Sequence, residues 1–161
     1  MPKRVFTQAF PAVNAIIKKD GKFLLVQQGK IKKSHYNKWA LPGGWIEAEN
    51  DDPVSAVIRE VKEETGLDFE PDGIVGIFSF ENQTLKDETG GVPHPIKIVF
   101  RGKSKGTVNP IEQEEIKDAK WFDFKELARV DWRTPFDTEI FLAYQQGEKH
   151  SLSMIHHKVQ K

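Results

Sequence analysis

Residues 41–67 read LPGGWIEAENDDPVSAVIREVKEETGL, and this stretch decides the fold. A brief apolar segment ends in a Pro-Gly-Gly turn, where the chain must reverse or expose its backbone. A helix follows, because Asp51 or Asp52 can cap it and Pro53 suits a first helical position, where its missing N–H would be unpaired anyway. Gly66 is placed to end the helix. The stretch therefore predicts a glycine-rich turn followed by one well-delimited helix.

Three glutamates share one flank of that helix. At about 100° per residue, Glu60, Glu63 and Glu64 fall together, because residues three and four apart lie on one face. Like charges repel, so the grouping is destabilising as a purely structural arrangement. A bound divalent cation would turn the repulsion into attraction, and all-oxygen ligation favours Mg²⁺ or Mn²⁺ over zinc or copper. The side expected to pack on a sheet carries Val54, Val57, Ile58, Val61 and Thr65.

Strand-like segments flank the helix on both sides. Residues 12–18 and 22–28 are apolar runs around an Asp-Gly turn, which predicts a hairpin. Further strands are expected at 74–80, 96–102 and 121–124, a polar loop at 81–95, and a closing helix from Arg133 to Tyr144. Strands before and after a central helix imply a mixed sheet covered on both faces. The predicted class is α/β, an α/β/α sandwich in one domain over residues 1–161, with a tail that frays after about residue 147.

Composition narrows the function classes. There are 24 basic and 24 acidic residues, so the chain has no formal net charge, whereas a duplex-binding protein usually carries a basic excess. The absence of cysteine excludes disulfides, thiolate metal sites and cysteine nucleophiles. No segment has the apolar core of a signal peptide or the length of a membrane span. We expect a cytoplasmic protein with no membrane partner, and nucleic acid is a disfavoured partner.

The sequence resembles a known family signature. Residues 41–47 and 56–67, reading LPGGWIE and AVIREVKEETGL, are similar to the Nudix box, Gx5Ex7REUxEExGU with U an aliphatic residue. The REUxEExGU half is matched at every specified position, by Arg59, Glu60, Val61, Glu63, Glu64, Gly66 and Leu67. This many fixed positions make a chance match far less frequent than for a lone glycine motif. The resemblance implies a Nudix-type α/β/α sandwich and a hydrolase.

One departure lies in the first half of the box. Counting back from Arg59, the first glutamate of the signature falls on Asp51, and counting forward from Gly44 it falls on Asn50. The loop is one residue longer than the pattern, and neither candidate is a glutamate. Asp51 keeps the carboxylate with a shorter reach.

The resemblance also implies roles. Glu60, Glu63 and Glu64 would bind or orient Mg²⁺ or Mn²⁺, with the main-chain carbonyl of Gly43 as a further ligand. Arg59 would orient a glutamate of the cluster, and its i, i+4 spacing from Glu63 permits this, although an ordinary surface ion pair has the same spacing. Water attacks phosphorus directly, so no protein nucleophile is needed.

A general base is expected from a loop beyond the box. Glu112, Glu114 and Glu115 lie in an acidic stretch before Trp121, and we favour Glu112 or Glu115, although each is equally an ordinary exposed acid. Candidate substrate-binding residues are Trp45, Lys38 and His94. Trp45 would stack on a nucleobase or pack in the core, Lys38 belongs to a basic loop, and His94 lies at the end of the long polar loop.

The strand pattern and the late acidic loop resemble the ADP-ribose-pyrophosphatase-like branch of the family. This implies metal-dependent hydrolysis of a phosphoanhydride bond in a nucleoside diphosphate linked to another moiety, such as ADP-ribose or a nucleotide sugar. A MutT-like nucleoside triphosphate pyrophosphatase and a non-catalytic nucleotide-sensing Nudix domain are the alternatives, while RNA-cap processing would call for a more basic surface. The expected partner is a nucleotide substrate, and a homodimer is left open.

Overall fold

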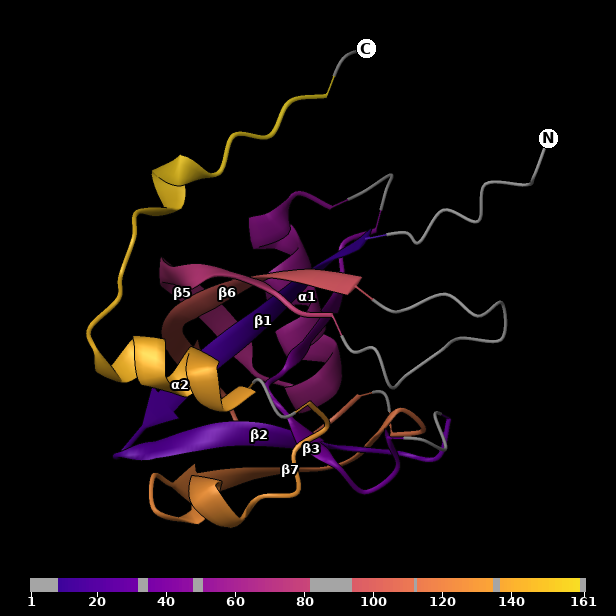
Figure 1. The fold of residues 1–161 in the computed structure, drawn as a ribbon. Coiled ribbons are helices and arrows are strands. Elements are labelled where there is room, and N and C mark those ends of the chain that lie inside the picture. Colours follow the sequence, from indigo (N-terminus) through magenta and orange to yellow (C-terminus); the bar gives the residue numbers. More distant parts are fainter. Residues whose placement is uncertain are drawn as a thin grey trace, which may run out of the picture.

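Seven strands build the sheet of this protein, whose computed structural model describes residues 9–31, 35–47, 51–81, 94–111, 113–134 and 137–159 (Figure 1). In chain order the elements are β1 (Ala9–Lys19), β2 (Lys22–Gln28), β3 (Trp39–Ala40), β4 (Gly43–Trp45), α1 (Pro53–Thr65), β5 (Asp68–Ser79), β6 (His94–Lys105), β7 (Ile116–Asp123), the 3₁₀ turn η2 (Glu126–Arg129), α2 (Asp137–Gln145) and the 3₁₀ turn η3 (Leu152–Met154).

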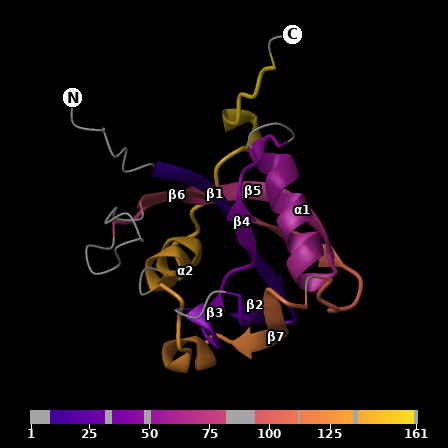
Figure 2. The same cartoon turned by 90° about the vertical axis from the view of Figure 1, so that its right-hand side faces the viewer.

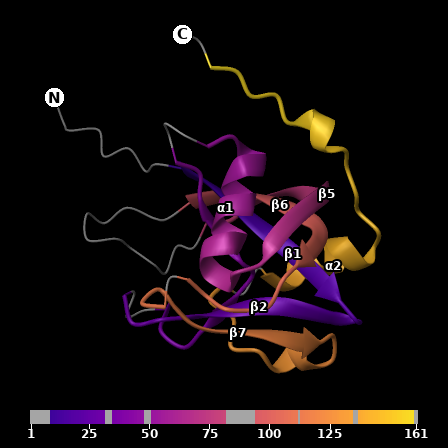
Figure 3. The same cartoon turned by 180° about the vertical axis from the view of Figure 1, so that it is seen from behind.

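The sheet is mixed, and β1 is its central strand. β1 runs parallel to β6 along most of its length and antiparallel to β4, while β5 closes that side against β6 (Figure 3). β1 meets β2 only at the hairpin end, where Lys18 pairs with Phe23 and Lys19 with Lys22. β2 then pairs with β3 and β7. The strand order β3-β2-β1-β6-β5 thus joins two parts of one sheet through a short hairpin contact.

Helices cover both faces of the sheet, as Figure 2 shows with α1 and α2 on opposite sides of the strands. Successive side chains of a strand point to opposite faces. On β1, Val13, Ala15 and Ile17 therefore belong to the cluster that includes Val57 and Val61 of α1, whereas Ile16 belongs to the cluster that includes Ile140 and Phe141 of α2. Double-sided burial explains why β1 and β2 read as continuous apolar runs. The predicted mixed-sheet α/β/α sandwich is confirmed.

Several predicted boundaries are wrong. The Pro-Gly-Gly segment was expected to be only a turn, but Gly43–Trp45 forms β4 on β1. β5 begins at Asp68 instead of residue 74, and β7 at Ile116 instead of residue 121. The added ends mix exposed polar residues with single buried ones, so they resemble loops in sequence. Arg133 is not helical, and α2 begins at Asp137.

The buried face of α1 also differs in one residue from the prediction. Ile58 was expected to pack on the sheet but is 38% exposed. The buried arc of the helix is centred instead on Ala56, Val57 and Val61, with Thr65 at its end. Ile58 lies one position beyond this arc. In the described part of the chain, none of the helices has the length and apolar character needed to cross a membrane.

Candidate active site

The two ends of α1 are fixed by the residues that the sequence singled out. The N-cap is Asp52, whose carboxylate accepts hydrogen bonds from the main-chain N–H groups of Val54 at 2.9 Å and Ser55 at 3.1 Å. Gly66 ends the helix in the left-handed conformation, with φ of 76°, and its N–H donates to the carbonyl of Lys62. Of the two aspartates considered as caps, Asp52 has this role, which leaves the side chain of Asp51 available for another.

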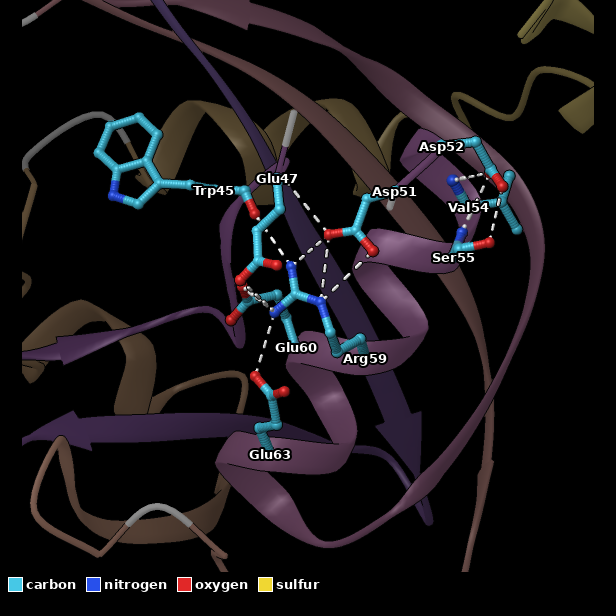
Figure 4. A network of polar contacts seen from close by, with 9 residues as sticks. All are labelled: Trp45, Glu47, Asp51, Asp52, Val54, Ser55, Arg59, Glu60 and Glu63. Atoms are coloured by element: carbon cyan, nitrogen blue, oxygen red, sulfur yellow. Dashed lines mark hydrogen bonds and ion pairs between the residues drawn. The ribbon is translucent and has the colours of Figure 1, made fainter. Parts of the chain in front are cut away.

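Arg59 lies at the centre of an acidic network (Figure 4). Its Nη2 donates to Asp51 Oδ2 at 2.6 Å and to the carbonyl of Trp45 at 3.2 Å. Its Nη1 donates to Glu60 Oε1 at 2.9 Å and to Glu63 Oε2 at 3.1 Å, which is the i, i+4 pair expected from the sequence. The hydrogen bond to Arg59 holds the pKa of Asp51 below its usual value, and the same carboxylates raise the pKa of Arg59. The arrangement ties β4 and the box loop to the acidic flank of α1.

Glu60 lies directly over β4. An ideal Cβ built on Gly44 would stand 2.5 Å from Glu60 Oε2, a distance that no side chain at residue 44 could accept without movement. Gly44 pairs with Val13 of β1, so the strand position is fixed from the other side. The absence of a side chain at Gly44 therefore lets the carboxylate of Glu60 lie against the backbone, and any side chain there would displace it.

Glu64 is the most buried acid of α1, with 7% of the residue exposed. Its carboxylate accepts a hydrogen bond from the N–H of Gly43 at 2.8 Å. Burial raises the pKa of Glu64 to about 8; the Gly43 hydrogen bond and the charge of Arg133 oppose this effect, and the charges of Glu60 and Glu115 add to it. Acidic side chains thus gather between β4, the buried side of α1 and the turn before β7.

The donor chemistry of this region fits a hard divalent cation. Carboxylate oxygens of Glu60 and Glu64 lie against β4, and a cation beside them would favour the ionised form of Glu64 that burial disfavours. Within the described ranges, no three acidic or histidine side chains converge closely enough to hold a metal ion as they stand. In this arrangement Arg59 donates hydrogen bonds to oxygens of Glu60 and Glu63.

The candidate bases lie in the turn before β7. Glu114 and Glu115 are exposed, and the carbonyl of Glu115 accepts a hydrogen bond from the N–H of Gly29 at 2.6 Å, which anchors the turn to the end of β2. The charge of Glu115 acts on Glu64, so this acid is electrostatically part of the cluster. Glu112 lies outside the described residues, as does Asn50 of the box loop.

The three candidate substrate residues lie apart from one another. Trp45 is 45% exposed and makes an edge-to-face contact with Phe10, and its carbonyl joins the Arg59 network. His94 begins β6, where its ring bonds to Ser79 Oγ at 2.6 Å, and β1 separates it from β4. Lys38 precedes β3, in the other part of the sheet, and its carbonyl accepts from Gln28. Of the three, Trp45 contacts the acidic network.

A buried ion pair on the α2 face was missed from the sequence. Lys97 of β6 is 4% exposed and Asp137 of α2 is 1% exposed, with Nζ and Oδ1 3.6 Å apart. Burial lowers the pKa of Lys97, and the charge of Asp137 opposes that effect. Asp137 Oδ2 is buried without a hydrogen-bond partner in the described part of the chain. The sequence signal was a lone lysine inside the β-branched run of residues 96–99, on the same strand face as the buried Val99.

Comparison with known proteins gives a consistent set of similarities. The family model described as "NUDIX domain" matches residues 8–144. An ADP-ribose pyrophosphatase of Methanocaldococcus jannaschii is 33% identical over 133 residues, which are 79% of this chain and 69% of that protein. A MutT-like protein of Streptomyces ambofaciens is 30% identical over 74% of this chain and 60% of its own length. A solved NUDIX hydrolase from Nitrosomonas europaea superposes with a TM-score of 0.79 at 25% identity, over 94% of this chain and 98% of that one.

Proposed function

The chain belongs to the Nudix hydrolase family, as its sequence predicted, and from this premise we propose that it hydrolyses a phosphoanhydride bond in a nucleoside diphosphate linked to a second moiety, with Mg²⁺ or Mn²⁺ as cofactor. The observation that carries the proposal is the position of Glu64. Glu64 is buried, accepts a hydrogen bond from the Gly43 N–H and lies in the field of Glu60 and Glu115; burial raises its pKa to about 8, and a cation beside it would favour the ionised form that burial disfavours.

Each residue of the network has a proposed role. Glu60 and Glu64 would hold the cation, with Glu63 and the carbonyl of Gly43 as further ligands. When bound there, the cation would neutralise the diphosphate, activate a water molecule and stabilise the charge on the leaving phosphate. Arg59 would act as a positioning residue, because its guanidinium fixes the side chains of Glu60 and Glu63.

A proton must leave the attacking water. Glu115 is the described acid of the expected loop whose charge reaches Glu64, so we propose it as the general base, with Glu112 as the sequence-based alternative. Glu115→Gln and Glu112→Gln, measured separately, would identify the base: the true one should lower kcat about 10²- to 10⁴-fold. An equal and small effect of both would remove this part of the proposal.

The substrate class rests on the relatives. The archaeal relative's name supports ADP-ribose or a similar nucleotide sugar, and the Streptomyces relative's name supports the alternative, a MutT-like nucleoside triphosphate pyrophosphatase. Trp45 is exposed beside the network and would stack on the nucleobase. The acids of the box, Glu60, Glu63 and Glu64, are all present, which argues against a Nudix domain that only senses nucleotides.

The deciding experiment is chromatographic analysis of products from a panel of nucleotides with Mg²⁺ or Mn²⁺. The products AMP and ribose 5-phosphate would identify an ADP-ribose hydrolase. A nucleoside monophosphate and pyrophosphate would identify a nucleoside triphosphate pyrophosphatase. Turnover should require metal and fall at least about 100-fold in Glu63→Gln/Glu64→Gln. Glu139→Gln, an exposed acid of α2, is the matched control and should keep full turnover. Nucleotide binding without any cleavage would contradict the proposed enzyme and favour a non-catalytic nucleotide-sensing domain.

A further inference from the structure

A cavity of about 830 Å³ lies beside the candidate site, at the end of β2 and the start of β7. This volume is in the range of small-molecule sites. Its wall combines two lysines, two acids, one aromatic ring and several apolar side chains, a mixture unlike a purely hydrophobic groove. The lining residues are Gly29, Lys30, Tyr36, Glu114, Ile116 and Lys117, together with neighbours in the same two segments.

The turn that carries Tyr36 is firmly held. The N–H of Gln28 donates to the carbonyl of Lys38 at 2.9 Å, and the N–H of Asn37 donates back to the carbonyl of Gln28 at 3.0 Å. The side-chain amide of Gln27 adds a hydrogen bond to the carbonyl of Asn37 at 2.9 Å. Asn37 itself has φ of 65°, a left-handed conformation that asparagine tolerates better than most residues. These hydrogen bonds therefore fix the turn that carries Tyr36.

Lys117 reaches the same turn from β7. Its Nζ donates to Asn37 Oδ1 at 2.8 Å and lies 5.4 Å from the centroid of the Tyr36 ring. Among the residues that the structure describes, these contacts leave two of the three ammonium hydrogens for a ligand. Tyr36 is 38% exposed, so ring and ammonium group form one accessible surface of the cavity. Such an oriented cation can meet an anionic group at little entropic cost.

The cavity adjoins the proposed catalytic acids. The segment that forms one wall is tied to the last turn of α1, because the N–H of Ile111 donates to the carbonyl of Glu63 at 2.9 Å. Gly29, which lines the cavity, donates to the carbonyl of Glu115, and the charge of Glu115 reaches Glu64. A molecule in this cavity is thus next to the place where the diphosphate is proposed to bind.

We infer that the cavity binds a phosphorylated sugar, the second moiety of the substrate. The inference rests on the proposed function and deepens it. Lys117 and Lys30 would contact the phosphate, which in the intact substrate is the sugar-side phosphate of the diphosphate. Glu114 would accept hydrogen bonds from sugar hydroxyl groups, and the face of Tyr36 would cover the sugar ring. A neutral balance of lysines and acids suits a ligand with both hydroxyl and phosphate groups better than a triphosphate.

Direct binding of ribose 5-phosphate, measured by calorimetry on metal-free protein, tests the inference. Lys117→Ala should weaken binding about tenfold or more, because a hydrogen bond to a charged group is removed. Tyr36→Ala should also weaken it, while Tyr36→Phe should bind as wild type does. Lys103→Ala removes an exposed lysine of β6 outside the cavity and is the control. In turnover, Lys117→Ala should raise KM for ADP-ribose with kcat unchanged, and leave KM for a nucleoside triphosphate unaltered.

The outcomes separate this inference from the proposed function. Ribose 5-phosphate should still bind Glu63→Gln/Glu64→Gln, because those residues do not line the cavity. Cleavage of ADP-ribose by wild type with no effect of Lys117→Ala or Tyr36→Ala would overturn the inference alone. Equal binding of inorganic phosphate, insensitive to Tyr36→Ala, would also overturn it, since the lysines would then be a general anion site. Binding without cleavage would overturn the proposed function alone.

Discussion

The carboxylate of Glu60 lies so close to the main chain of Gly44 that a methyl group at residue 44 would stand 2.5 Å from Oε2 and 2.6 Å from Oε1. Gly44→Ala should therefore push Glu60 out of place. We expect turnover to fall about 100-fold, since small misplacements near a reacting centre have effects of this size, while the fold survives. Steady-state kinetics and chemical denaturation measure the two effects.

Gly147→Ala is the matched control for Gly44→Ala. Gly147 has φ of 84° and open space around its Cβ position, so alanine there adds backbone strain without a collision. The control should lose about 1 kcal/mol of stability and keep its turnover. Full turnover in Gly44→Ala would mean that the position of Glu60 does not matter for the reaction.

The two adjacent aspartates should respond differently to alanine. Asp51→Ala removes one of the partners of Arg59 and loosens the guanidinium that orders Glu60 and Glu63, so both turnover and stability should fall, the latter by about 1.5–3 kcal/mol. Asp52→Ala removes a helix cap, should cost about 1 kcal/mol, and should leave turnover nearly unchanged. Identical kinetic losses in both variants would contradict the separate roles.

Because the pKa of Glu64 is raised in the folded protein, we expect the free energy of unfolding of the metal-free protein to fall as pH rises. The pKa of Glu64 is about 8 in the folded chain and near 4.5 when unfolded, so between these values the folded state holds a proton that the unfolded state has released. That stabilisation is complete below pH 4.5 and is lost as pH rises through 8. Each unit of pKa difference between the folded and unfolded states corresponds to about 1.4 kcal/mol of stability. Losing that amount lowers Tm by about 3–6 °C.

Thermal melts of wild type and Glu64→Gln over this pH range, with a chelator, isolate the contribution. The difference between the two curves should be largest at high pH, and Mg²⁺ should raise Tm of wild type at pH 8 but not that of the variant. Parallel curves for the two proteins would show that Glu64 does not bind a proton preferentially in the folded state.

The buried pair on the α2 face should be far more sensitive to loss of one partner than of both. Lys97→Met leaves Asp137 buried and uncompensated, which should cost about 3–5 kcal/mol. Lys97→Met/Asp137→Leu removes both charges and should be more stable than the single variant. Denaturant unfolding of the three proteins checks this, and additive losses would contradict it.

Local sequence signals predicted the box helix well because each signal has a single physical cause. Asp52, Pro53 and Gly66 act within one turn of their own position, so their roles need no knowledge of distant residues. Spacing along a helix likewise places Arg59 beside Glu63. The hairpin of β1 and β2 follows from its turn and its apolar runs for the same reason.

Contacts between distant segments were beyond the reach of such signals. β4 forms because β1 offers it a partner strand, and the Pro-Gly-Gly sequence alone reads as a turn. The pairing of Lys97 with Asp137 depends on how α2 lies over β6, which no local pattern specifies. The extra residue in the box loop left open which residue takes the place of the first glutamate of the signature, and in the structure Asp51 pairs with Arg59.

The short contact between β1 and β2 affects how the acids of α1 lie relative to the turn that carries Glu115. The acids of α1 lie against β4 and β1, whereas the turn with Glu115 is attached to β2 and β7. In the described part of the chain, β1 and β2 pair directly only at Lys18 and Lys19. The spacing between the proposed metal ligands and the proposed base therefore depends on the twist of this hairpin as well as on the main-chain hydrogen bonds from Asn109 and Ile111 to the end of α1. Substitutions in the Asp20-Gly21 turn should therefore change turnover without altering any residue of the candidate site.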